Sequence, residues 1–110
     1  MAQLNKVDAL KAILREYTKI KPANGDLDTF ESFDDEQGQY VLLQSGWQGS
    51  KYIHGAFLHV QIKGEKIWIH YDGTEYGIAN ELVEAGIPKD AIVLGFRHPY
   101  MRPYTEFAVA

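Results

Sequence analysis

The sequence predicts an α+β domain: an antiparallel four-stranded meander with an N-terminal helix and a C-terminal helix plus a short strand. Three observations predict this class. Apolar residues recur with helical spacing over residues 3–20, four β-type segments fill residues 27–71, and a shorter helical stripe begins at Ile78. We take residues 1–110 as a single domain, because a chain of this length can bury about two-thirds of its unfolded-state surface in one core.

The first predicted helix, residues 3–20, places its apolar side chains on one broad arc and ends before Lys21-Pro22, since proline disfavours helix in the residue before it. Lys11, Arg15 and Lys19 lie on one i, i+4 ridge of this helix. We interpret the ridge as a solvated face, and the alternative is a contact for an acidic partner or for the DNA backbone. The apolar arc consists of Leu4, Val7, Leu10, Ile13, Leu14, Tyr17 and Ile20.

Four segments are predicted strands, because β-branched and aromatic residues dominate them and turn residues separate them. No proline falls inside the block, as expected for paired strands. After a turn at Ala23–Asp26, the predicted strands cover residues 27–34, 40–47, 51–62 and 65–71, with loops at Asp35–Gln39, Gln48–Ser50 and Lys63–Gly64.

A two-residue loop at Lys63–Gly64 would set the register of the last hairpin. Because side chains alternate between the faces of a strand, this register collects one almost entirely apolar face, which we predict to face the core. The resulting pairs are Ile62 with Glu65, Val60 with Ile67, Leu58 with Ile69, and Ala56 with Tyr71.

The other face of that hairpin would pair His59 with Trp68 and Phe57 with His70. Aromatic residues are unusual on a solvated sheet face, so we expect a cover: the second helix, the C-terminal segment or another subunit. Of these we predict another subunit, in a homo-oligomer that shares this face. With Asp72, the two histidines could in principle bind a divalent metal or do acid–base work. The alternative, which we favour, is that the imidazoles pack on the neighbouring rings and donate to backbone carbonyls.

The last third of the chain is rich in backbone signals. Asp72 is a candidate N-cap with Glu75 in the reciprocal capping-box position, followed by the apolar stripe from Ile78. Gly86 stands where a left-handed C-cap belongs, and Pro88 blocks continuation of the helix. A short apolar run, Ile92-Val93-Leu94, follows.

The C-terminal loop combines bases and aromatics. Arg97 and Arg102 bracket His98-Pro99-Tyr100. Arginine and tyrosine are enriched at the energetic centres of protein interfaces, so Arg97, Tyr100 and Arg102 are candidate partner contacts. The alternative is an ordinary surface loop.

Composition excludes several classes of function. The net charge of −4 divides into +3 over residues 1–22, −6 over residues 23–40 and −1 over the remainder, so a clustered basic face exists on the first helix alone. Cysteine is absent, and neither a signal peptide nor a membrane span is visible, so we expect a cytoplasmic protein without membrane association. No nucleophile motif or phosphate loop occurs, and we assign no catalytic residue, cofactor or metal.

Taken together, the motifs resemble the XisI-like proteins, known as excision controlling factors of a nitrogen-fixation DNA element. The resemblance runs from the first helix to the end of the chain. One departure is Ala91, since these proteins more often have Asp directly before the Ile. The motifs are Ser45–Gly49, His59 with Lys66–Ile69, Asp72–Glu75 with Ile78-Ala79, Glu81–Val83, Ala85–Asp90, Ile92–Phe96, Pro99, Arg102 and Tyr104–Val109.

The resemblance implies an α+β domain that controls site-specific excision beside a XisH-like partner and a recombinase. It supplies no catalytic residues. We therefore expect a non-catalytic regulatory protein that acts through protein–protein contacts, with DNA contact possible but indirect. The alternatives are a DNA-binding accessory factor and a small metal-dependent hydrolase or ligand-binding domain.

Overall fold

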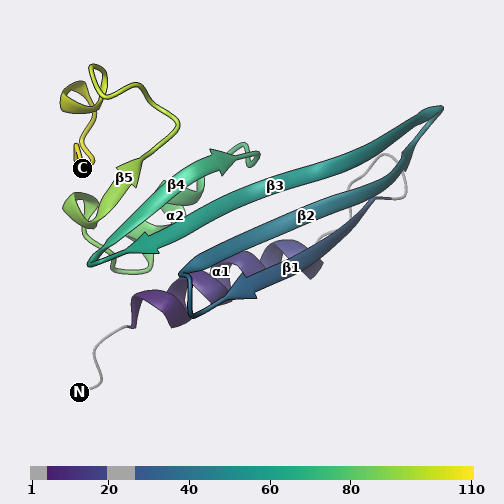
Figure 1. The fold of residues 1–110 in the computed structure, drawn as a ribbon, viewed down its shortest axis with the longest axis horizontal. Coiled ribbons are helices and arrows are strands. Elements are labelled where there is room, and N and C mark those ends of the chain that lie inside the picture. Colours follow the sequence, from purple (N-terminus) through teal and green to yellow (C-terminus); the bar gives the residue numbers. More distant parts are fainter. Residues whose placement is uncertain (1–4, 20–26) are drawn as a thin grey trace.

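The computed structural model describes residues 5–19 and 27–110, and shows a single sheet with two helices on one side (Figure 1). The predicted helix ends at residues 3–4 and 20, and the turn at Ala23–Asp26, lie outside the described residues. The elements are α1 (Lys6–Lys19), β1 (Asp28–Asp34), β2 (Gln39–Gln48), β3 (Lys51–Lys63), β4 (Lys66–Asp72), α2 (Ile78–Glu84), η1 (Lys89–Ala91), β5 (Ile92–Leu94) and η2 (Arg102–Tyr104).

The sheet has the order β1-β2-β3-β4-β5. Its first four strands are the predicted antiparallel meander, so the α+β class is confirmed. The predicted sheet has four strands, whereas the observed sheet has five. Ile92–Leu94 pairs parallel to β4 and makes the sheet mixed. Parallel pairing is possible because α2 returns the chain to the end of the sheet where β4 began.

Both helices cover the same face of the sheet (Figure 1). Leu10 and Leu14 of α1, and Ile78 and Leu82 of α2, are fully buried there. The sheet contributes a continuous apolar layer, because its inward side chains alternate with outward ones along each strand. This layer consists of Tyr40, Leu42, Leu58, Val60, Ile67, Ile69 and Ile92.

The last hairpin has a different register from the predicted one. Its turn is Gly64-Glu65, with Gly64 in a left-handed conformation (φ 61°), so Ile62 pairs with Ile67 and Val60 with Ile69. The predicted pairing is wrong by two residues. An even shift preserves the face of every side chain near the turn, and the prediction that Val60 and Ile67 face the core is therefore confirmed.

Two β-bulges interrupt the alternation farther from the turn. Phe57 is the extra residue opposite Leu42 and Leu43, and His70 is the extra residue between the partners of Val60 and His59. A bulge moves every later residue to the opposite face from the one that strict alternation predicts. Three predictions are wrong for this reason: Phe57 packs against the helix-side core, whereas Ala56 and Tyr71 are exposed.

The C-terminal third confirms one predicted helix terminus and modifies the other. Gly86 has φ 101°, and the N–H groups of Gly86 and Ile87 donate to the carbonyls of Val83 and Leu82, as in a Schellman C-cap. The helix begins at Ile78 behind Gly77, later than a capping box at Asp72 would place it. In the described residues, no helix is long and apolar enough to cross a membrane.

Candidate functional site

The sheet face opposite the two helices, called here the open face, presents large apolar groups to solvent. Phe30, Leu43 and Ala56 occupy one row across β1, β2 and β3, since Leu43 pairs with both of the others. Phe30 is 52% exposed and Leu43 is 39% exposed. A contiguous apolar patch of this kind is typical of an interaction surface.

His59 and His70 lie side by side on the open face, with ring centroids 4.9 Å apart. The Nε2 atom of His59 lies 2.6 Å from Oε1 of Gln39, and that of His70 lies 2.9 Å from Oε1 of Gln61. An amide oxygen accepts but cannot donate, so each imidazole donates through Nε2. Burial lowers the pKa of His70, and the nearby His59 and Lys63 lower it further, which favours the neutral ring.

The predicted role of the histidines as packed groups is confirmed in part. The ring of His70 stacks on Trp68 at 6.3 Å, but the hydrogen-bond acceptors are glutamine side chains instead of backbone carbonyls. The grouping of Asp72 with the two histidines is wrong, because the His70 bulge places Asp72 opposite the buried Leu58. In residues 5–19 and 27–110, no three His, Cys, Asp or Glu side chains are arranged to hold a metal ion.

Asp72 instead orders the chain between β4 and α2. Its Oδ1 accepts from the N–H and the hydroxyl of Thr74, and its Oδ2 accepts from the N–H of Ile78, the first residue of α2. A carboxylate at this point satisfies a helix N–H that would otherwise lack a partner.

Trp68 is covered by two cations. The Nζ atom of Lys63 lies 4.7 Å from its ring centroid, and the guanidinium carbon of Arg102 lies 5.2 Å from it. Arg102 also donates to the carbonyls of Arg97, Val109 and Gly95, at 3.2, 3.3 and 3.5 Å. Arg102 therefore attaches the C-terminal segment to β4, and little of its guanidinium remains for a partner.

The other two candidates in the C-terminal loop face solvent. Tyr100 is 81% exposed, with its ring stacked 5.0 Å from that of His98. Arg97 is exposed and lies over the ring of Phe96. Tyr104, which was not among the predicted contacts, is 84% exposed in the same segment. This exposed loop is the part of the predicted contact set that remains accessible.

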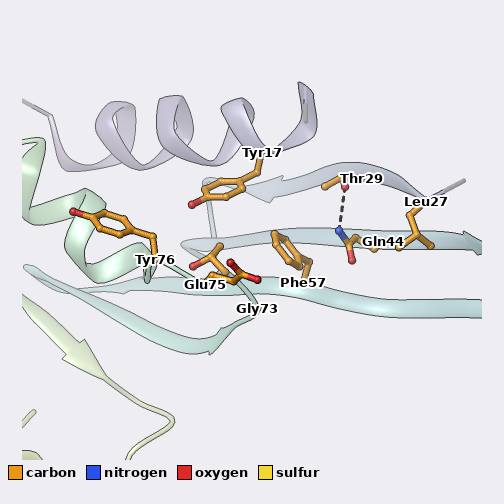
Figure 2. Close-up of a pocket in the computed structure, with 9 residues that line it drawn as sticks. Tyr17, Leu27, Thr29, Gln44, Phe57, Gly73, Glu75 and Tyr76 are labelled. Atoms are coloured by element: carbon orange, nitrogen blue, oxygen red, sulfur yellow. Dashed lines mark hydrogen bonds between the residues drawn. The ribbon is translucent and has the colours of Figure 1, made fainter. Parts of the chain in front are cut away.

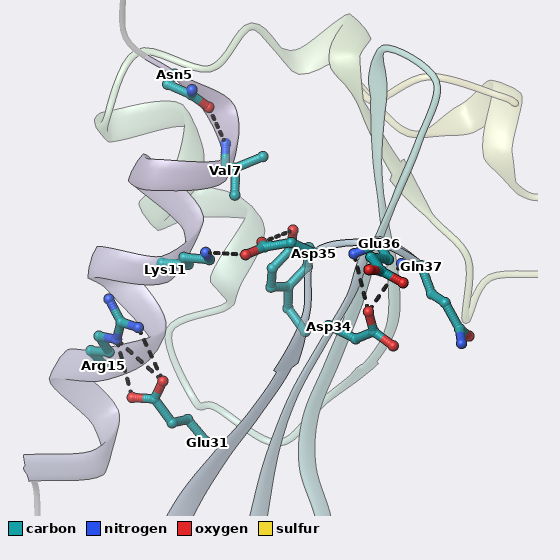
Figure 3. Close-up of polar contacts among 10 residues, drawn as sticks. Asn5, Val7, Lys11, Arg15, Glu31, Asp34, Asp35, Glu36 and Gln37 are labelled. Carbon is teal, nitrogen blue, oxygen red and sulfur yellow. Dashed lines mark hydrogen bonds and ion pairs between the residues drawn. The ribbon is translucent and has the colours of Figure 1, made fainter.

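The basic ridge of α1 faces acidic residues (Figure 3). Lys11 is 2.9 Å from Asp35, and both Nε and Nη2 of Arg15 donate to the carboxylate of Glu31. Lys19 is 3.3 Å from Glu16 on the helix itself. The acidic strand and turn that follow thus form ion pairs with Lys11 and Arg15, two of the three bases of the ridge that we considered for DNA contact.

Asp35 links this ion-pair network to the core. It accepts from Lys11 and from the Tyr40 hydroxyl, and both hydrogen bonds, the first above all, hold its pKa below the usual range. Burial, followed by the hydrogen bond to Asp35, raises the pKa of Tyr40 to about 12. The contact between the ridge and the hairpin is therefore part of the packing of α1 on the sheet.

A cleft of about 530 Å³ on the helix side was not predicted (Figure 2). Tyr17 and Phe57 meet edge to face there, 6.0 Å apart, and Gln44 donates to Thr29 across the neighbouring strands. The cleft exists because the bulge turns Phe57 toward the helices. A Cβ on Gly73 would lie 2.8 Å from the Phe57 carbonyl oxygen, so the chain requires glycine where it passes this ring.

The polar groups of this cleft hold the helices together. The Tyr17 hydroxyl donates to the carboxylate of Glu81, and burial, followed by that hydrogen bond, raises the pKa of Tyr17. The phenol is therefore protonated at neutral pH and is not an activated nucleophile. In the sequence, Tyr17 looked like one more member of the apolar arc, and nothing marked Phe57 as its partner.

Comparisons with known proteins agree with this geometry. Residues 1–109 match the model of the XisI protein family. A crystal structure of a XisI-like protein from Anabaena variabilis ATCC 29413 is 33% identical in sequence with a TM-score of 0.82. The structure of the fdxN element excision controlling factor XisI from the same organism is 34% identical with a TM-score of 0.78. Both alignments cover 96% of this chain and 100% of the other. A search of curated proteins finds no significant match.

Proposed function

Because the chain belongs to the XisI family, we propose that it is a non-catalytic regulator of the site-specific excision of a DNA element and acts by binding a XisH-like partner. The observation that supports this most directly is the match over residues 1–109, since one similar structure is that of an excision controlling factor.

The C-terminal loop is the surface that we assign to the partner. From Ala91 to Thr105 the chain contains Arg97 and Arg102 and no acid, and its two most exposed tyrosines are Tyr100 and Tyr104. Tyrosines of this kind bury large area at low cost in conformational entropy, and an exposed arginine selects an acidic counterpart. We therefore expect the contacted segment of the partner to be acidic.

Co-purification with a XisH-like protein tests the proposal. The wild-type chain and Lys51→Glu, which makes the same charge change at the exposed end of β3, should retain the partner. Arg97→Glu combined with Tyr100→Ala should lose it, and should lower excision in a reporter strain to the same extent. Failure of the wild-type chain to bind, or equal binding by the double variant, would contradict the proposal.

Direct DNA binding is the outcome that would replace it. The α1 ridge would then shift a DNA probe at low salt, and the shift would weaken with charge reversal at Arg15 and Lys19 and with added salt. The ion pairs of Arg15 with Glu31 and of Lys11 with Asp35 oppose this outcome, because these bases already have anionic partners.

A further inference from the structure

The open face has a charge pattern that runs across its strands. Asp28 and Asp34 lie on the outward side of β1, at the acidic edge. Lys63 pairs with Lys66 beside the β3–β4 turn, and Arg102 lies over Trp68, so the side of the face formed by β3 and β4 carries basic residues. The apolar row of Phe30, Leu43 and Ala56 crosses the middle.

We infer that a second copy of this chain covers the open face, related by a two-fold axis that lies in the interface parallel to the strands. With the axis running between β2 and β3, the rotation places β1 of one copy over β4 of the other, and β2 over β3, and leaves β5 outside the shared area. Asp34 shares a cross-strand row with Trp68, through Gln39 and Gln61. Asp34 of one copy would therefore meet Lys63 of the other, which lies over Trp68, twice by symmetry.

The apolar row is self-complementary in the same arrangement. Leu43 and Ala56 are paired neighbours on β2 and β3. The rotation that exchanges these two strands places the large Leu43 side chain of each copy over the small Ala56 of the other. Facing sheets pack closely where large and small residues alternate in this way.

The other two-fold axis in the plane, perpendicular to the strands, gives a poor interface. With the axis crossing β1 at Glu31, it would place β1 over β1 and bring Asp28 of one copy against Asp34 of the other. Juxtaposed like charges at an interface are unfavourable, so the charge pattern selects the parallel axis. Seven residues of β1 across four strands span about 24 by 19 Å, a projected area of roughly 460 Å² per partner, compared with the ~800 Å² per partner of a standard stable interface.

The oligomeric state of the chain in solution tests whether a second copy covers the open face. Light scattering of the wild-type chain at micromolar concentration should give twice the mass of one chain. Leu43→Glu, at a position already partly exposed, should weaken the dimer at least tenfold without unfolding it, whereas Met101→Glu in the exposed C-terminal loop should have no effect. A wild-type monomer, or a Leu43→Glu dimer as tight as the wild type, would overturn the inference.

Single cysteines test the orientation, because the natural chain has none. A mixture of Leu43→Cys chains with Ala56→Cys chains should cross-link through a short bis-maleimide faster than either variant alone. Faster cross-linking of Ser32→Cys chains to one another would instead place β1 over β1 and overturn the parallel axis.

This inference is independent of the proposed function. Arg97→Glu combined with Tyr100→Ala should abolish binding of the XisH-like partner and leave the dimer intact. Leu43→Glu should weaken the dimer and leave partner binding intact. Two results together would refute the dimer: a monomeric wild-type chain, and loss of partner binding by Leu43→Glu. The open face would then belong to the partner.

Discussion

The guanidinium of Arg102 lies over the ring of Trp68, 5.2 Å from its centroid, and simultaneously donates to three backbone carbonyls of the C-terminal segment. One side chain thus joins β4 to the segment that presents Arg97 and Tyr100. A Cβ on Gly95 would lie 3.1 Å from the Ile69 carbonyl oxygen and 3.3 Å from the Trp68 ring, so a larger residue there would push this segment slightly away from β4.

Arg102→Ala should release the C-terminal segment. The loss of the cation–π contact and three hydrogen bonds should lower the free energy of unfolding by about 1–2 kcal/mol. Trp68 emission should shift to longer wavelength, and amide exchange should accelerate over residues 95–109. Arg97→Ala is the matched control, because its guanidinium covers only the neighbouring Phe96. Equal spectra for the two variants would show that the pair does not attach the segment.

Asp72→Ala should destabilise the junction of β4 with α2. It leaves the N–H groups of Thr74 and Ile78 without their acceptor, at a cost of about 1–2 kcal/mol in the free energy of unfolding. Asp72→Asn keeps one oxygen acceptor and should lose less. Glu75→Ala, at the exposed position of the predicted capping box, should change chemical denaturation little. If Glu75→Ala lowered the free energy of unfolding as much as Asp72→Ala does, the predicted capping box would be supported instead.

Gly38→Ala should cost more than Gly64→Ala. Both residues have left-handed backbones, with φ 67° and 61°, which costs an L-residue roughly 1–2 kcal/mol. A Cβ at residue 38 would also lie 2.5 Å from the Ile62 carbonyl oxygen, while residue 64 has open space around it. Thermal unfolding should separate the variants by at least about 1 kcal/mol, and equal losses would show that the hairpin relaxes around the new methyl group.

Acidification should reveal the neutral state of His70. Its pKa is lowered from 6.5, mainly by burial and then by His59 and Lys63. A base with a depressed pKa binds fewer protons when folded, so its contribution is complete above pH 6.5 and is lost as pH falls below that value toward the folded pKa. In chemical denaturation at a series of pH values, the free energy of unfolding should therefore fall less on acidification for His70→Gln than for the wild type. Parallel declines would contradict the assignment.

Local patterns predicted much of this fold. The helical stripe located α1, the β-type segments located the four-stranded meander, and Gly86 with Pro88 marked the end of α2. The alternation of Val60 and Ile67 identified the core face even though the register was wrong by two residues, because side-chain direction has a period of two. Of the candidate contact residues, His59, Trp68 and His70 do share the open face, and Arg97 and Tyr100 are exposed.

Tertiary structure decided the remainder. The bulges at Phe57 and His70 reassign Phe57, Tyr71 and Asp72 to other faces, since one inserted residue reverses all later alternation and leaves no mark in composition. Pairing of β5 with β4, and of Arg15 with Glu31, joins residues distant in sequence. Propensity and periodicity describe a chain within a few neighbouring residues, whereas sheet register, ion pairing and exposure depend on which distant segments come into contact.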